Sequence, residues 1–209
     1  MKYGNIKLEW FGHATFMVKG KEIVIYFDPF TLPMNPEKAD LILITHDHYD
    51  HCDPGKVDMI RKPDTVIITT EKSATKLSGN VKAIFTGSTL EEKGIRILAV
   101  PAYNIGKPFH PRGSGIGFVI TVDDIRIYHA GDTDFIPEMS EIKTDIALLP
   151  IGGTYTMDEE SAAKAASVIK PKVVIPIHYG YIDQTDADPE SFREKLRQKN
   201  PEIDVRILE

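Results

Sequence analysis

The chain of 209 residues lacks three things: a second cysteine, an excess of positive charge and long apolar runs. Its single cysteine, Cys52, excludes a disulfide within the chain and favours a reducing compartment. No stretch approaches the roughly 20 consecutive apolar residues of a membrane-spanning helix, and the N-terminal segment lacks the apolar core of a signal peptide. These absences lead us to expect a cytoplasmic protein that does not insert into a membrane.

Acidic residues outnumber basic ones, 31 to 25, and the formal net charge is −6. Nucleic acid and anionic membranes are therefore poor candidates as partners, and we expect a small-molecule substrate. Hydrophobic residues make up 42% of the chain and charged residues 27%, as is typical of a soluble globular domain. No linker or low-complexity stretch divides the sequence, which predicts one domain over residues 1–209. The oligomeric state stays open, and a homo-oligomer is compatible with the sequence.

The most informative stretch is LILITHDHYDHCD, residues 41–53. Its apolar start predicts a short buried strand, after which three of the seven histidines of the chain fall within six residues, among carboxylates. His46 and His48 are two residues apart, so both project to the same side of an extended segment. Asp50 and His51 follow in a turn and can face a second point nearby. One loop could therefore supply two adjacent metal ions, and imidazole with carboxylate suits Zn²⁺, Mn²⁺ or Fe²⁺.

Residues 46–51 match in full the His-x-His-x-Asp-His signature of the metallo-β-lactamase superfamily of dinuclear metallohydrolases. The chain resembles this superfamily over nearly its whole length, and it is similar to uncharacterised archaeal and bacterial hydrolases near the sugar-lactonase and phosphodiesterase branches. The resemblance implies an α/β (α+β) fold, a four-layer αββα sandwich with the metals at one edge. The alternation of strands and helices predicted over residues 41–100, with one short helix over residues 71–79, favours the same class. Action on β-lactams does not follow, since the superfamily hydrolyses many substrates.

Four predicted strands each end in a polar residue at the carboxyl end, where the ligand sites of α/β sheets lie. These residues are Asp28, His46, Asp132 and His178. By the resemblance, metal one is bound by His46 and His48, metal two by Asp50, His51 and His178, and Asp132 bridges the two ions. The resemblance also implies that Asp28 supports the site from outside the ligand set, although an aspartate before Pro29 commonly forms a turn.

The resemblance implies two divalent metal ions as cofactors, with Zn²⁺ favoured and Mn²⁺ or Fe²⁺ as alternatives. Two such ions lower the pKa of a shared water, so that a metal-bound hydroxide near neutral pH attacks an ester, lactone or phosphodiester. The catalytic residues predicted for this scheme are Asp132, as the bridge, and Asp50, which orients the hydroxide or shuttles a proton. Cys52 is interpreted as a small packing residue and not as a thiolate nucleophile.

Metal one lacks an obvious third ligand. The resemblance implies a histidine shortly after the strand that precedes the loop at residues 101–115, but Asn104 stands at that place. A neutral amide oxygen is a weak zinc ligand, whereas His110 offers an imidazole on a loop long enough to fold back. We rank His110 first as the additional ligand and His13, in the first predicted turn, second. A weakly held or absent metal one is the third alternative.

Substrate-binding residues are expected on the same loop, because long loops in compact domains are often functional. We predict this role for Tyr103, Asn104 and Arg112. Lys107 could bind an anionic substrate as well, although charged loop residues are more often simply solvated. Tyr155, in a glycine-containing loop after a later buried strand, is expected to line the pocket from another side.

Two other classes of function compete with the hydrolase. A protein of this fold could bind metal without catalysis, and the missing third histidine of metal one supports that hypothesis. A redox-active metalloprotein is the other alternative, since a flavin-linked di-iron branch of the fold carries out redox chemistry. That branch carries glutamate where this chain has His48. The sequence leaves the substrate and the identity of the metal open.

Overall fold

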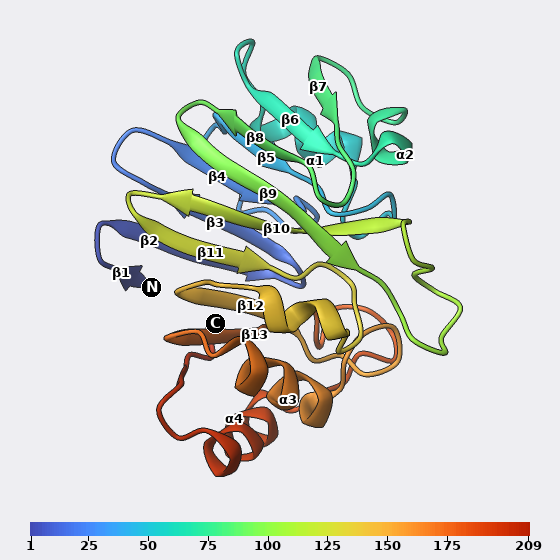
Figure 1. Cartoon of the computed structure of the whole chain (residues 1–209). Coiled ribbons are helices and arrows are strands. Elements are labelled where there is room, and N and C mark those ends of the chain that lie inside the picture. Colours follow the sequence, from blue (N-terminus) through green and yellow to red (C-terminus); the bar gives the residue numbers. More distant parts are fainter.

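The computed structural model describes residues 1–209 and divides them between two seven-stranded sheets (Figure 1). The N-terminal part of the chain forms the first sheet, in which the strands lie side by side in chain order. They are β1 (Lys2–Tyr3), β2 (Ile6–Gly12), β3 (Thr15–Lys19), β4 (Val24–Phe27), β5 (Leu41–Leu43), β6 (Val66–Thr69) and β7 (Asn80–Ala83). The first three neighbouring pairs are antiparallel, and the next three are parallel.

The second sheet repeats this arrangement with the rest of the chain. Its strands are β8 (Thr89–Glu92), β9 (Ile95–Ala102), β10 (Gly115–Val122), β11 (Ile125–His129), β12 (Ile146–Pro150), β13 (Val173–Ile177) and β14 (Asp204–Val205). Again three antiparallel pairs are followed by three parallel pairs. The two parts of the chain therefore share one order of strands and one pattern of directions.

Helices cover the outer faces of the two sheets. They are α1 (Pro54–Ile60), α2 (Glu71–Ala74), α3 (Glu159–Ile169) and α4 (Pro189–Lys199), with the short 3₁₀ helix η1 (Pro137–Glu141). Val57 and Ile60 of α1 pack on the first sheet, whereas α3 and α4 pack on the second (Figure 1). The predicted αββα sandwich is confirmed.

The main core lies between the sheets and depends on the alternation of side chains along each strand. In β4, Ile25 and Phe27 face the second sheet, whereas Val24 and Tyr26 face α1. All four are buried, which explains why this strand is a continuous apolar run in the sequence. From the second sheet, Phe118 of β10 meets Phe27 with ring centroids 6.3 Å apart.

Helix starts agree with the sequence better than helix ends and edge strands do. Asp53 and Asp188 accept hydrogen bonds from the first-turn N–H groups of α1 and α4, as their position before proline predicts. The helix predicted over residues 71–79 is only one turn long, because the N–H groups of Lys76 and Leu77 bond three residues back and tighten the chain. The half-exposed edge strands β1 and β8 were not predicted. No helix combines the length and apolarity needed to cross a membrane.

Phe118→Ala should lower the free energy of unfolding by about 3–5 kcal/mol, because the sheets on either side cannot collapse into the cavity. Urea unfolding followed by circular dichroism measures the change. Phe85→Ala is the matched control, since that ring is 76% exposed and such a surface change typically costs no more than about 0.5 kcal/mol. Equal destabilisation by the two variants would mean that packing between the sheets does not limit stability.

Candidate metal centre

Strands from both sheets bring the candidate ligands to one edge of the sandwich. Asp28 directly follows β4, and His178 directly follows β13. His46 and Asp132 come three residues after β5 and β11, respectively. Asp28 and His178 have φ angles of +41° and +57°, and His13 in the β2–β3 turn has +51°. Non-glycine residues rarely adopt this left-handed conformation, and its strain is concentrated at functional sites.

His46, His48 and His110 form the first group of candidate ligands, with donor atoms within 4.8 Å of one another. His110 Nε2 lies 3.2 Å from His48 Nδ1. The loop between β9 and β10 therefore folds back over the histidine motif. The histidine that the sequence ranks first as the additional ligand is the one that the structure brings beside His46 and His48.

Asn104 orients His110 and does not join the group itself. Its Oδ1 accepts a hydrogen bond from the backbone N–H of His110 and lies 3.0 Å from His110 Nδ1. The carbonyl oxygen of Tyr155 lies 3.2 Å from the same nitrogen and accepts a hydrogen bond from Asn104 Nδ2. Because both neighbours of Nδ1 are acceptors, Nδ1 carries the proton, and the Nε2 lone pair of His110 faces the other histidines.

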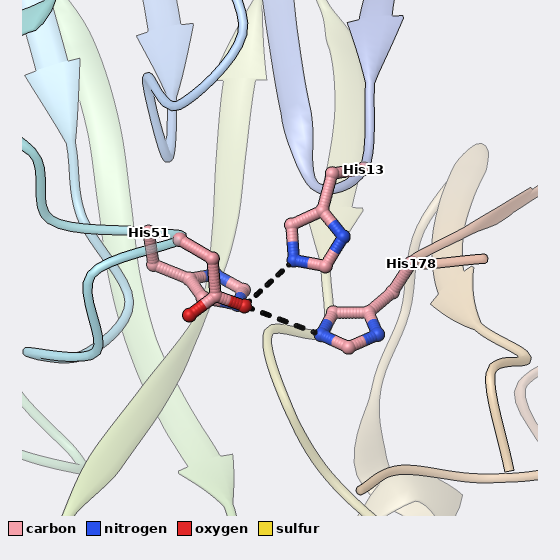
Figure 2. Close-up of side chains that lie close together, drawn as sticks. His13, His51 and His178 are labelled. Carbon is pink, nitrogen blue, oxygen red and sulfur yellow. Dashed lines mark hydrogen bonds and ion pairs between the residues drawn. The ribbon is translucent and has the colours of Figure 1, made fainter. Parts of the chain in front are cut away.

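His13, Asp50, His51 and His178 form the second group. Figure 2 shows the imidazoles of His13, His51 and His178 converging from three separate segments of the chain. Asp50 Oδ2 lies 2.9 Å from His13 Nε2. It lies 3.4 Å and 3.9 Å from the Nε2 atoms of His51 and His178. The sequence offers His13 as a ligand of metal one, but the structure places it in the opposite group, because the β2–β3 turn approaches from the side of Asp50.

Asp132 lies between the two groups. Its Oδ2 is 3.2 Å from His110 Nε2 and 3.9 Å from His46 Nε2 in the first group. The same oxygen is 3.0 Å from His178 Nε2, and Oδ1 is 3.3 Å from His51 Nε2, in the second. Burial raises the pKa of Asp132, but the His178 and His51 imidazoles outweigh burial and hold it well below its usual range. An anionic carboxylate thus occupies the place where a bridge between two cations would stand.

The donor atoms at the centre fit a divalent cation. The Nε2 atoms of His46, His51 and His178 and the Oδ1 atom of Asp132 are buried without a hydrogen-bond partner. A buried polar atom left unpaired costs about 1–3 kcal/mol, so four in one place call for a common partner. Tetrahedral ligands at zinc bond lengths stand about 3.3 Å apart, and the 3.0 and 3.3 Å separations around Asp132 are of that size.

Asp28 fixes the orientation of two imidazoles from behind. Its Oδ2 accepts hydrogen bonds from His51 Nδ1 at 2.7 Å and from the Thr45 hydroxyl at 2.8 Å. The Thr45 oxygen in turn lies 3.0 Å from His46 Nδ1 and accepts its proton. Both rings therefore present Nε2 to the centre, as metal-bound histidines backed by a carboxylate do. Thr45 was not predicted from the sequence, although a hydroxyl directly before the first histidine was the available signal.

Burial and charge set the protonation of the imidazoles. Burial lowers the pKa of His46 well below its usual range, and the nearby His51 adds to the effect. Burial likewise lowers the pKa of His13 to about 4. It would lower the pKa of His51 too, but three surrounding carboxylates outweigh it and raise that pKa well above its usual value. His46 therefore offers a free lone pair at neutral pH, whereas His51 holds a proton that a metal ion would displace.

A cavity of about 710 Å³ opens over the centre, and one of the four predicted substrate-binding residues, Tyr155, lines it. The hydroxyl of Tyr103 donates to Glu138 at 3.0 Å, and the guanidinium of Arg112 pairs with Glu138 and lies 5.0 Å from the centroid of the Tyr103 ring. Glu138 therefore holds both residues away from the cavity. Asn104 also lies outside the lining, because it is committed to His110.

Most of the cavity wall was not predicted from the sequence. The lining adds apolar and acidic side chains from four loops: Phe30, Tyr49, Phe109, Tyr181, Ile182 and Asp183. The available signal was the placement of these residues, since large apolar side chains follow Asp28 and His178 within a few residues and another lies inside the histidine motif. Such residues on polar loops indicate a binding surface.

Three other residues near the centre pack against or hydrogen-bond to residues that are not candidate ligands. His129 Nε2 donates to the carbonyl oxygen of Ala14 at 2.9 Å, and its ring stacks on Phe27, so His129 packs beside the centre. Asp134 accepts hydrogen bonds from the Ile105 N–H and from Lys107 Nζ. Cys52 is buried, and burial raises the pKa of its thiol to about 11.

Comparison with known proteins agrees with this geometry. Residues 7–178 match the model of the β-lactamase superfamily domain. A protein of Thermoplasma acidophilum named UPF0173 metal-dependent hydrolase is 41% identical, with 90% of each chain covered. A relative of the same name in Archaeoglobus fulgidus is 35% identical over 97% of this chain and 96% of its own. A crystal structure from Parabacteroides distasonis, 38% identical, superimposes with a TM-score of 0.85 over 98% of this chain and 94% of that one.

Asp28→Asn should weaken metal binding by about 10–100-fold. Asparagine has the same size and tolerates the left-handed backbone, but it replaces a charged acceptor beside His51 Nδ1 with a neutral amide. Competition with a chromogenic chelator measures the affinity. Asp124→Asn is the control, an exposed turn residue that also has positive φ, at +65°. Parent affinity in Asp28→Asn would remove Asp28 from the support of the site.

The native thiol of Cys52 should react with a disulfide reagent on the order of 100-fold more slowly than an exposed cysteine, since burial keeps it protonated. The absorbance of the released thiolate, recorded before and after adding urea, measures the rate of this reaction.

We also expect Cys52→Ala to keep turnover within a few-fold of the parent. Loss of turnover with metal content and folding intact would return the thiol to the mechanism.

Proposed function

This chain belongs to the β-lactamase superfamily, and from that premise we propose that it is a hydrolase dependent on bound divalent metal ions. The observation that carries the proposal is the pair of histidine groups that share Asp132, with unpaired buried donor atoms facing one another. The names of the relatives from Archaeoglobus fulgidus and Thermoplasma acidophilum support it.

The proposal assigns two ions to the centre. One is held by His46, His48 and His110, the other by Asp50, His51 and His178, with Asp132 between them. Zn²⁺ suits these nitrogen-rich sets, and Mn²⁺ or Fe²⁺ accept the same donor types. Bound ions supply a water of lowered pKa and polarise the oxygen of the substrate. His13 stays outside both sets and fixes Asp50 through its Nε2–H.

Asp50 and the cavity wall carry the remaining steps. The carboxylate of Asp50 lines the cavity and is held at 2.9 Å by His13. It orients the attacking water and takes up a proton from it, which then passes to the leaving oxygen. One water is consumed, its oxygen forms a bond to the carbonyl carbon or phosphorus, and the bond to the leaving alcohol breaks. An ester, lactone or phosphodiester fits this scheme.

A metal-binding protein without hydrolysis is the alternative, and the absent third histidine of metal one was the reason for it. The 3.2 Å separation of His110 Nε2 from His48 Nδ1 weakens that reason. Nothing in the cavity favours redox chemistry over hydrolysis.

Protein loaded with Zn²⁺, Mn²⁺ or Fe²⁺ should turn over at least one member of a panel of chromogenic esters, lactones and phosphodiesters, and chelation should abolish the activity. Asp132→Asn should lower kcat/KM by about 10²–10³-fold, since several kcal/mol of transition-state stabilisation depend on the ions. Elemental analysis of the same samples should give two metals per parent chain and fewer in this variant. Asp124→Asn serves as the control. Full activity and two metals in Asp132→Asn would contradict the assignment.

A further inference from the structure

We propose that the substrate of this site is a neutral ester or lactone with an apolar group beyond the reacting bond. Esters that carry a further negative charge beyond the reacting group fit the cavity poorly. The inference rests on the proposed hydrolase function and narrows its substrate class. Three features of the cavity carry it: an aromatic wall, the absence of any available cation, and the fixed positions of the aromatic side chains.

The wall of the cavity is aromatic on both sides. Five of its twelve lining residues are aromatic: Phe30, Tyr49, Phe109, Tyr155 and Tyr181. Phe109 packs edge-on against Tyr155 with centroids 4.8 Å apart. Phe30 and Tyr49 form a second pair at 5.9 Å. Aromatic side chains in such pairs offer apolar area to a ligand at a low cost in conformational entropy.

Several of these rings are exposed to solvent. Tyr49 is 68% exposed, Tyr181 48% and Phe109 39%. Single exposed apolar residues are common, but three around one opening form an aromatic patch beside the metal centre. The patch therefore marks the place where an apolar part of a ligand would be removed from water.

No cation is available in the cavity for an anionic substrate beyond the bound metals. The twelve lining residues include no lysine and no arginine, and Asp183 adds a carboxylate. Lys107, on the adjoining loop, pairs its ammonium with Asp134 and donates hydrogen bonds to the carbonyl oxygens of Gly153 and Thr156. Arg112, on the same loop, forms an ion pair with Glu138. Phosphate and carboxylate recognition depends on such groups, so a second negative charge on the substrate would go uncompensated.

The aromatic wall is held in place by the fold. Tyr181 lies so close to Gly12 that a Cβ at that glycine would meet the ring at 2.2 Å. Its ring also packs edge-on against Trp10 with centroids 5.7 Å apart. Trp10 is anchored in turn, since its Nε1–H donates to the carbonyl oxygen of His13. The turn that positions Asp50 thus also positions one side of the cavity.

Trp10 supplies a direct probe of occupancy. It is the single tryptophan of the chain, and its contact with Tyr181 couples its emission to whatever fills the cavity. A change in its fluorescence reports binding even where no turnover occurs.

The test uses two hydroxamates with the same metal-binding head and different tails. Hexanohydroxamic acid ends in a methyl group, and adipic monohydroxamic acid ends in a carboxylate at the same place. With metal-loaded protein, we expect the neutral tail to bind at least about tenfold more tightly by calorimetry and by Trp10 emission. The matched ester pair, 4-nitrophenyl hexanoate and 4-nitrophenyl hydrogen adipate, should show the same order of kcat/KM.

Phe109→Ala and Tyr181→Ala should each reduce the preference for the neutral tail by about three- to tenfold, while metal content and thermal midpoint stay at parent values because both rings are partly exposed. Phe85→Ala is the control, an exposed phenylalanine outside this cavity. Its preference should equal that of the parent.

The outcomes separate this inference from the proposed function. Protein that retains no metal overturns the hydrolase proposal and this inference with it. Protein that binds metal and both hydroxamates equally, or the anionic one more tightly, overturns the substrate class alone. A change of oligomeric state in Phe109→Ala or Tyr181→Ala without a change in tail preference would make the aromatic rim an interface between copies of the chain, and would likewise overturn it.

Discussion

The hydrogen bonds that the Asp28 carboxylate accepts are the interaction on which the rest of the centre depends. A buried carboxylate is costly unless its oxygens accept hydrogen bonds, and those of Asp28 are satisfied by Thr45 and His51 of the histidine motif. The parallel pairing of β4 with β5 places Phe27 opposite Leu43, so the residues that follow these strands meet at a fixed level. A shift of one residue in this register would turn every side chain to the opposite face. The pairing of β4 with β5 therefore also fixes how the histidines of the motif face the centre.

The sequence predicts those parts of the centre that depend on local pattern, and it fails where loops decide. Asp28, His46, Asp132 and His178 were found because a polar residue after an apolar strand is conspicuous, and the parallel strands bring such residues together. The third ligand of metal one had to be ranked, with His110 before His13, because only the path of the loop decides which histidine returns to the motif. Arg112 was expected in the cavity, but the sequence does not reveal that Glu138 takes up its charge. The aromatic wall depends on contacts such as that of Tyr181 with Gly12, between residues far apart in the chain.

The two sheets share one arrangement of strands, but the carboxylates that follow their fourth strands have different roles. Each sheet has a carboxylate shortly after its fourth strand in chain order, Asp28 after β4 and Asp132 after β11. Asp28 is fully buried and faces the back of the histidines. Asp132 stands three residues beyond its strand, past Gly131 with φ of +64°, and reaches the front. A small difference in loop length thus separates a supporting carboxylate from a central one.

The candidate ligands are divided between the sheets, with a consequence for how the molecule holds together. His46, His48, Asp50 and His51 follow a strand of the first sheet, whereas His110, Asp132 and His178 belong to loops of the second. On the proposed two-ion assignment, ions that draw on both sets would link the two sheets at this edge of the sandwich, and their binding free energy would add to the cohesion between the two halves. Under that assignment, loss of the metal would leave a chain whose two sheets separate more readily at the edge where the cavity opens.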